Sequence, residues 1–355
     1  MRTVLTVLHE ISGIYQLPNS EDVVLLSSED RSVRVFLTTA RTRYELHLRR
    51  LKALGTVQAQ VFVGPGESRE LAPYRQRFDE AFARVQLKQN DLRHGVLMVT
   101  EVSGEISDQV LDHLQDYGDF CARLKVFDPE NLQTLAERAT RIAFAGLALS
   151  LGESITDTLA WRGNIAIAYE PGSQRPTYSL AINASLSHTS RMQLTSEAAT
   201  NAAEFASHIS DADELETIVR LLSLSAKANT EPMTAFLAAW SALEIFVQEV
   251  FKSDCEPLAY DLISQSVPET ALFVAKTREV MSNKYNIRDK FSLVACMLAG
   301  TEAVADIEIF KTIKKRRDDL AHAMKGDVRE LPAERARALL RKYLKLHLER
   351  LRATK

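Results

Sequence analysis

The chain has 355 residues, of which 46% are hydrophobic and 26% are charged, and its formal net charge at pH 7 is −3. This composition is ordinary for a globular protein with an ample core and about two domains, and it excludes a general polyanion binder. The charge is unevenly distributed. From Lys311 onward there are 15 Lys and Arg against 6 Asp and Glu, a balance of +9, whereas the preceding residues carry −12. A basic C-terminal part on an acidic body predicts a local anionic ligand.

The cysteines indicate neither a disulfide framework nor a zinc site, because Cys121, Cys255 and Cys296 are far apart and odd in number. We therefore expect no metal, no cofactor and a cytoplasmic location. The first ten residues are too short and too alternating for a signal peptide. The most apolar helical stretch, residues 142–151, is too short to span a bilayer, so no membrane role is expected.

The first hundred residues predict half-buried strands, because apolar and polar side chains alternate along them. The Gly-Pro-Gly sequence at residues 64–66 is interpreted as a turn, since it lacks the Lys-Ser/Thr and the helix opening of a phosphate loop. A helix is expected at residues 71–87. The strands are expected at residues 33–37, 44–48, 57–63 and 95–102.

Helices at residues 107–123 and 129–151 and a hairpin of strands at 165–169 and 178–186 complete the predicted first region. His188 is interpreted as an exposed residue at a strand end. No catalytic constellation is found in residues 1–210, which are therefore assigned as a mixed α+β module without a stated role. The predicted domain boundary lies near Ser210, and residues 211–355 are predicted to be all helical.

The helical region is predicted to begin with a capping box at Asp211–Glu214 and to centre on a buried helix that starts at residues 229–232, Asn-Thr-Glu-Pro. Glu244 lies inside this apolar helix, and a buried carboxylate needs a partner, for which Arg and Lys are the obvious candidates. Two interpretations stay open: a core salt bridge or solvent-facing position, or a supporting residue that orients Arg317. The last helix is expected from Pro332.

Residues 306–324 predict one helix with Asp306 as N-cap and an apolar stripe of Ile309, Ile313, Leu320 and Met324. Near its end lie a permanently cationic Arg, which binds phosphate, and a His, which exchanges protons near neutral pH. The plainer alternative is a solvated basic helix end whose His caps the last carbonyls. The candidate set is Arg317, Asp318 and His322.

Pairs of similar spacing occur elsewhere, at Arg41–His47 and Arg341–His347, but no acid follows either Arg. His347 lies on an apolar helix face and is interpreted as a core residue rather than a catalyst.

Four segments in sequence carry a family resemblance: W-S-A-L-E-I-F, I-R-D-K-F-S-L-V, K-K-R-R-D-D-L-A-H and a closing basic amphipathic helix. Residues 211–355 resemble the HEPN superfamily of helical bundles, and its Apea-like branch in particular. The family signature is an Arg, often followed by Asn, Asp or His, and a His after four to six residues. Arg317, Asp318 and His322 match it, whereas Ala323 stands where the family often has Gly.

The resemblance implies metal-independent RNA cleavage by a homodimer in which two Arg–His sets face each other across a two-fold axis. Many members are toxins or anti-phage defence effectors. Other members bind RNA or a nucleotide without cleaving it, so a non-catalytic dimeric scaffold is the alternative, and a plain helical interaction domain is a third. Residues 1–210 are hypothesised to sense a trigger or to restrain the nuclease.

In the expected mechanism His322 is general base on the ribose 2′-OH or general acid on the leaving 5′-oxygen, and Arg317 stabilises the charge of the transition state. Asp318 would orient the imidazole, and the products would be a 2′,3′-cyclic phosphate and a 5′-OH. Lys314, Lys315 and Arg316 would hold flanking phosphates. Positions 317 and 322 lie about 140° apart on a helix, so their convergence needs the long Arg side chain, fraying of the helix end or the partner chain.

Overall fold

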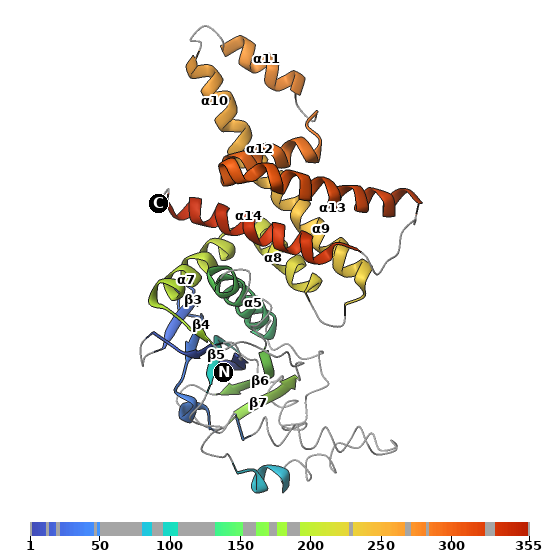
Figure 1. Ribbon diagram of the computed structural model, residues 1–355. Coiled ribbons are helices and arrows are strands. Elements are labelled where there is room, and N and C mark those ends of the chain that lie inside the picture. The colour runs from blue at the N-terminus through green and yellow to red at the C-terminus, as the bar shows by residue number, and fades with distance from the viewer. Residues whose placement is uncertain are drawn as a thin grey trace. The chain divides into compact units, whose positions relative to one another are not determined.

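The chain divides into two compact units, Met1–Ser207 and His208–Lys355, close to the predicted boundary near Ser210. Figure 1 presents the computed structural model. The residues that the structure describes are 2–11, 14–18, 22–45, 48–49, 80–86, 95–105, 132–151, 161–169, 176–182, 192–226, 230–266, 271–281, 284–323 and 331–353.

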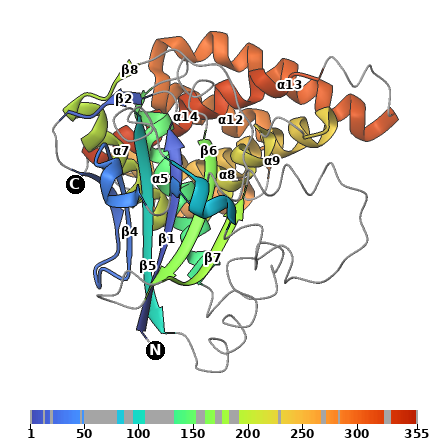
Figure 2. The ribbon, with the colours of Figure 1, turned by 90° about the horizontal axis from the view of Figure 1, so that it is seen from below.

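The first unit is built on a six-stranded sheet in which each described pair of neighbouring strands is antiparallel. The strand order is β3-β4-β5-β1-β6-β7, so that the N-terminal strand lies inside the sheet (Figure 2). A further pair, β2 and β8, is parallel. The bounds are β1 Arg2–Ile11, β2 Ile14–Gln16, β3 Val23–Ser27, β4 Val33–Thr38, β5 Val96–Glu105, β6 Trp161–Tyr169, β7 Pro176–Ile182 and β8 Met192–Gln193.

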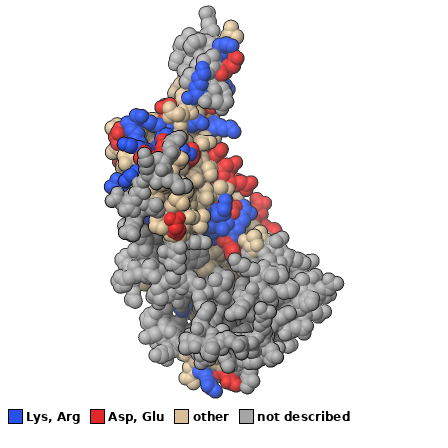
Figure 3. Space-filling model, turned by 90° about the vertical axis from the view of Figure 1, so that its right-hand side faces the viewer, with Lys and Arg blue, Asp and Glu red and all other residues tan. Residues whose placement is uncertain are grey.

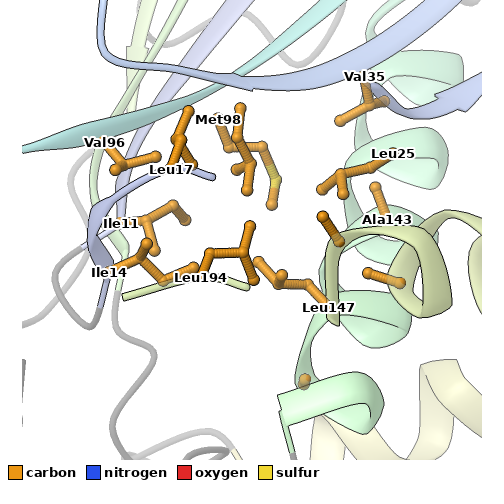
Figure 4. Close-up of a cluster of buried hydrophobic side chains, with 14 of the residues drawn as sticks. Ile11, Ile14, Leu17, Leu25, Val35, Val96, Met98, Ala143, Leu147 and Leu194 are labelled. Carbon is orange, nitrogen blue, oxygen red and sulfur yellow. The ribbon is translucent and has the colours of Figure 1, made fainter. Parts of the chain in front are cut away.

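Both faces of the sheet carry buried apolar side chains at β4 and β5, so the prediction that these strands are half-buried is wrong. Successive residues of a strand point to opposite faces. Along β5, Val96 and Met98 belong to the cluster drawn in Figure 4, together with Leu147 of helix α5, Leu132–Leu151. Leu97 and Val99 alternate with them and join a second buried cluster. Because α5 contacts β3, β4, β5 and β1, it covers the first of these faces.

Helix α7, Ser196–Ser210, packs closely against α5. A Cβ atom added to Gly146 of α5 would lie 2.5 Å from the backbone oxygen of Ala202. Glycine is therefore required at this position, since a side chain would have to push the two helices apart. A buried hydrogen bond of 2.6 Å between the hydroxyls of Thr100 and Thr140 joins α5 to β5.

Most predicted elements of this unit that fall on described residues are confirmed: the strands at 33–37 and 95–102, the helix at 129–151 and the hairpin. The strand predicted at 44–48 is wrong, because η1, Arg41–Tyr44, is a 3-10 helix and residues 45 and 48–49 are helical. Residues 80–84 are helical, within the helix predicted at 71–87. The elements predicted at 57–63 and 107–123, the Gly-Pro-Gly turn and His188 lie outside the described residues.

The second unit is a helical bundle. Helix α9 packs against α8, α12, α13 and α14 and is therefore central, as its almost uniformly apolar sequence predicts (Figure 1). A single π-helical turn, Phe251–Cys255, connects α9 to α10. The bounds are α8 Asp213–Ser225, α9 Pro232–Val250, α10 Glu256–Ser266, α11 Ala271–Met281, α12 Ile287–Ala299, α13 Ala303–Ala323 and α14 Ala333–Ala353.

The centre of the bundle is a chain of aromatic rings. Phe310 of α13 stacks on Phe291 of α12 with 4.1 Å between centroids and 6° between planes, and its other neighbour is Trp240 of α9 at 5.5 Å. Tyr343 of α14 meets Phe291 edge-on at 5.2 Å. Offset and edge contacts of this kind add to the stabilisation that burial of the rings provides. The four rings fix α13 against α9, which positions the candidate site.

Two predicted helix caps are corrected. Helix α13 begins at Ala303, so Asp306 lies inside its first turn rather than at the N-cap. In this position Asp306 accepts a hydrogen bond of 2.8 Å from the Tyr343 hydroxyl. Helix α8 has Ala212 at its N-cap without a side-chain cap, so the predicted capping box is wrong. By contrast, the Glu231 side chain accepts hydrogen bonds from the backbone N–H groups of Met233 and Thr234 in the first turn of α9, so this helix begins at Pro232, within the predicted start at residues 229–232.

Candidate functional site

The buried face of α13 leads directly to Arg317. The buried residues of α13 follow one another at intervals of three and four, and a further step of four leads to position 317. The predicted stripe is only partly correct, because Ile313 is buried but Ile309 is 40% exposed, and Phe310 occupies the core position instead. The buried series is Ala303, Asp306, Phe310 and Ile313.

Arg317 thus stands where the core face meets solvent. Its side chain is 39% exposed, and its guanidinium carbon lies 5.9 Å from the centre of the Trp240 ring. A cation at this distance is attracted by the electron-rich face of an indole. Its Nη1 also donates a hydrogen bond of 3.2 Å to Asp318 Oδ1. The guanidinium is therefore held by two contacts in a side chain that stays 39% exposed.

Among the described residues, the hydrogen-bond partner of Glu244 is a ring, the indole of Trp240. Trp240 is 2% exposed, and its indole Nε1 donates a hydrogen bond of 2.9 Å to Glu244 Oε2, one helical turn along α9. We expected Arg or Lys in this role. Glu244 is connected to Arg317 through the indole ring, so the structure brings the two predicted residues to the same place by a different contact.

Asp318 is bound on both carboxylate oxygens. Lys314 Nζ lies 2.5 Å from Oδ2, and Arg317 Nη1 lies 3.2 Å from Oδ1. The hydrogen bond from Lys314, followed by the one from Arg317, lowers the pKa of Asp318 below its ordinary value, although partial burial acts in the opposite direction. The carboxylate is consequently ionised at neutral pH and holds the two cations on one side of α13.

The other predicted phosphate ligands follow on the same helix. Lys315 is exposed and Arg316 is half-buried. Lys311 forms an ion pair with Glu308 one turn earlier. On the face drawn in Figure 3, groups of Lys and Arg side chains alternate with Asp and Glu side chains over the described surface. A nucleic-acid contact on such a surface would be local rather than spread over a continuous basic face.

His322 lies in the last turn of α13, where its backbone is helical. Its side chain falls outside the described residues. The helix is regular up to position 323, so Arg317 and His322 are separated by five helical residues. Fraying of the helix end, one of the three predicted routes to their convergence, therefore does not apply before His322.

The competing Arg–His pair at the C-terminus is structural. Arg341 is 8% exposed and pairs with Glu334 at 2.8 Å. The imidazole of His347 is buried against Phe246, edge-on with 5.9 Å between ring centroids. This confirms the interpretation of His347 as a core residue.

Burial lowers the pKa of His347, while Asp254 Oδ2, 3.7 Å from its Nδ1, opposes this and Arg350 and His208 reinforce it. A lowered folded-state pKa means that the unfolded chain binds the proton more tightly. The contribution to stability is complete above about pH 6.5, the ordinary value, and is lost as the pH falls. We expect the unfolding free energy to decrease between pH 7 and 5, by at most ~1.4 kcal/mol per pH unit for this proton.

His347→Gln is expected to flatten that pH dependence, because the titrating group is gone. Urea unfolding followed by Trp240 fluorescence at pH 7 and pH 5, in a Trp161→Phe background, measures it. His188→Gln, which alters a histidine of the other unit, serves as the control. Equal slopes for the parent and His347→Gln would contradict the assignment.

Among the described residues, no group of three or more His, Cys, Asp or Glu is arranged to hold a metal ion. Cys255 and Cys296 are free thiols. The continuous run Pro232–Leu262 is long and apolar enough to pass as a bilayer-spanning helix, and 61% of its most apolar window is buried inside the unit. This run is longer than the stretch at residues 142–151 that was considered from the sequence. Because the core helix of a folded protein passes the same test of length and composition, we assign no membrane role to it.

Trp240 is the residue of this site that the sequence did not reveal. An aromatic residue in an apolar helix indicates a core position, and Trp240 is indeed in the core. The available signal was the polar residue four positions later, because a Trp followed at i+4 by a Glu has an acceptor for its N–H within reach.

Comparison of the chain with protein-family models, with curated proteins and with solved structures found no significant match to any of them.

Proposed function

We propose that this chain is a metal-independent endoribonuclease of the HEPN type that acts as a homodimer through its helical unit. The observation that carries the proposal is the state of Arg317. It is a permanent cation, held against Trp240 and Asp318, 39% exposed, and five positions before a histidine in the last turn of the same helix. The spacing and the acid after the Arg are those of the family signature.

In this proposal the scissile phosphate lies against the exposed part of the Arg317 guanidinium. One His322 imidazole removes the proton of the 2′-OH, the 2′-oxygen attacks phosphorus, and the 5′-oxygen leaves with a proton from a general acid. Arg317 stabilises the additional negative charge on the phosphoryl oxygens. Since α13 is regular between the two residues, the second subunit is the expected source of the histidine that meets a given Arg317.

The roles of the neighbouring groups follow from their contacts. Asp318 holds Arg317 and Lys314, so we assign it to the orientation of these two cations in addition to the predicted effect on His322. Lys315 and Arg316 hold flanking phosphates, which makes RNA binding weaken as salt increases. The sheet unit is the sensing or restraining part, and anti-phage defence or toxin activity is the proposed biological setting.

The test is incubation of the purified full-length protein with RNA in excess EDTA, with analysis of the product ends and of the mass in solution. We expect cleavage to a 2′,3′-cyclic phosphate and a 5′-OH by a dimeric protein. Cleavage that needs Mg²⁺, or products with a 5′-phosphate, would contradict this chemistry. RNA binding by a dimer that leaves the RNA intact would favour the non-catalytic scaffold.

A further inference from the structure

Four groups from two helices form a row that includes the proposed active-site cation, Arg317. The Trp240 indole donates to Glu244 at 2.9 Å, the face of the same ring lies 5.9 Å from the Arg317 guanidinium carbon, and Arg317 donates to Asp318 at 3.2 Å. The ring itself cannot turn freely, because it is almost fully buried and packs on Phe310.

We propose that Trp240, oriented by Glu244, is a positioning residue that fixes where the Arg317 guanidinium meets the scissile phosphate. This inference rests on the proposed ribonuclease function and adds to it a residue that touches neither RNA nor the reacting atoms. A long Arg side chain at a surface otherwise samples many rotamers, and a catalytic group must be held in one productive geometry.

The arrangement solves a problem that a direct ion pair would create. Asp318 already bonds Nη1 of the guanidinium, so a direct ion pair with Glu244 would place a second carboxylate on the N–H donors that bind phosphate bidentately. Glu244 acts on the ring instead, and the ring centre lies 5.9 Å from the guanidinium carbon. Among the described residues, the recorded hydrogen bond of Arg317 uses one of its five N–H donors.

The charge on Glu244 also strengthens the contact. A hydrogen bond to an anionic acceptor polarises the indole and moves electron density onto its ring, since bonded groups in a low-dielectric interior polarise one another. The ring face becomes more negative and attracts the guanidinium more strongly. Acceptor and charge are separable, because glutamine keeps the acceptor oxygen and removes the charge.

The kinetic test measures RNA cleavage by the full-length chain. We expect Glu244→Leu to lower kcat roughly tenfold with KM within about twofold, and Glu244→Gln to lower kcat about threefold, because a misplaced Arg317 loses interactions made mainly in the transition state. Trp240→Phe, which keeps a ring without the N–H, is expected to match Glu244→Leu. The double variant should be no slower than either single one, since both remove the same link.

Glu249→Leu is the matched control, because it removes a carboxylate from the same helix at a residue that is half-buried like Glu244. It is expected to leave kcat unchanged. Equal rates for Glu244→Leu and Glu249→Leu, or an additive loss in the double variant, would overturn the positioning role while leaving the nuclease proposal in place.

A spectroscopic test does not depend on activity. The chain has 2 Trp, so Trp161→Phe leaves the emission of Trp240 alone. Arg317→Met removes a charge beside the ring, and Glu244→Leu removes the acceptor of its N–H, so both are expected to shift the emission maximum, whereas Glu249→Leu is not. Absence of a shift in both variants would overturn the inference. A shift in a protein that cleaves no RNA would support the contact and reject the nuclease.

Discussion

Replacing His322 by alanine is expected to slow RNA cleavage by about 10²–10⁴-fold, and replacing Arg317 by alanine by about 10²–10³-fold. The first change removes the proposed proton-transfer group, and the second removes a preorganised donor from the developing charge on phosphorus. Single-turnover cleavage of a labelled RNA in EDTA measures both. The double variant should be little slower than the worse single variant, because residues that act as one set are strongly non-additive.

Two control substitutions test whether the loss of activity comes from the specific residues or from the removal of any positive charge or any histidine. Arg335→Ala removes an exposed Arg of α14, and His188→Ala removes a histidine of the other unit. Both should cleave RNA at the rate of the parent, and all four variants should remain dimers. Retention of activity in Arg317→Ala or His322→Ala would reject the assignment, as would an equal loss in the matched controls.

Local patterns predicted the secondary structure where only one period fitted them. The alternating residues of β4 and β5 became strands with both faces buried, and the apolar sequence of α9 became the central helix. The strand predicted at 44–48 failed because the separation of four between Tyr44 and Leu48 also fits a helical turn. Both residues are buried, and both have helical backbones. When the spacing of two apolar residues fits both a strand and a helix, the local sequence does not determine the structure. Packing against the rest of the unit determines it.

The candidate site was predictable to the extent that it lies within one helix. Asp318 follows Arg317 directly and lies four residues after Lys314, so adjacency and helical spacing alone bring the three groups together. The contact of Arg317 with Trp240 joins residues 77 positions apart and depends on how α13 packs on α9. No local pattern contains that information, which is why the ring was assigned to the core alone.

The choice between Ile309 and Phe310 illustrates the same limit. A stripe through Ile309 and Ile313 is compatible with helical spacing, and so is one through Phe310 and Ile313. The second is correct because the larger ring fills the space between Trp240 and Phe291, which no inspection of α13 by itself could show.

Phe310→Ala is expected to destabilise the helical unit by about 3–5 kcal/mol, as deletion of a buried aromatic side chain generally does. Phe310 is 0% exposed and contacts the rings of both Phe291 and Trp240, so its removal leaves a cavity that rigid neighbours cannot close. Urea unfolding in the Trp161→Phe background, followed by Trp240 fluorescence, measures the helical unit specifically.

Ile309→Ala is the matched comparison, because it deletes an apolar side chain one position away that is 40% exposed. We expect it to cost less than ~1 kcal/mol, since much of its surface is already in water and little cavity is created. The two variants thus discriminate between the stripe predicted from the sequence and the face that packs. An equal loss in both, or a larger loss in Ile309→Ala, would mean that α13 is rotated about its axis, and with it Arg317 would leave the Trp240 ring.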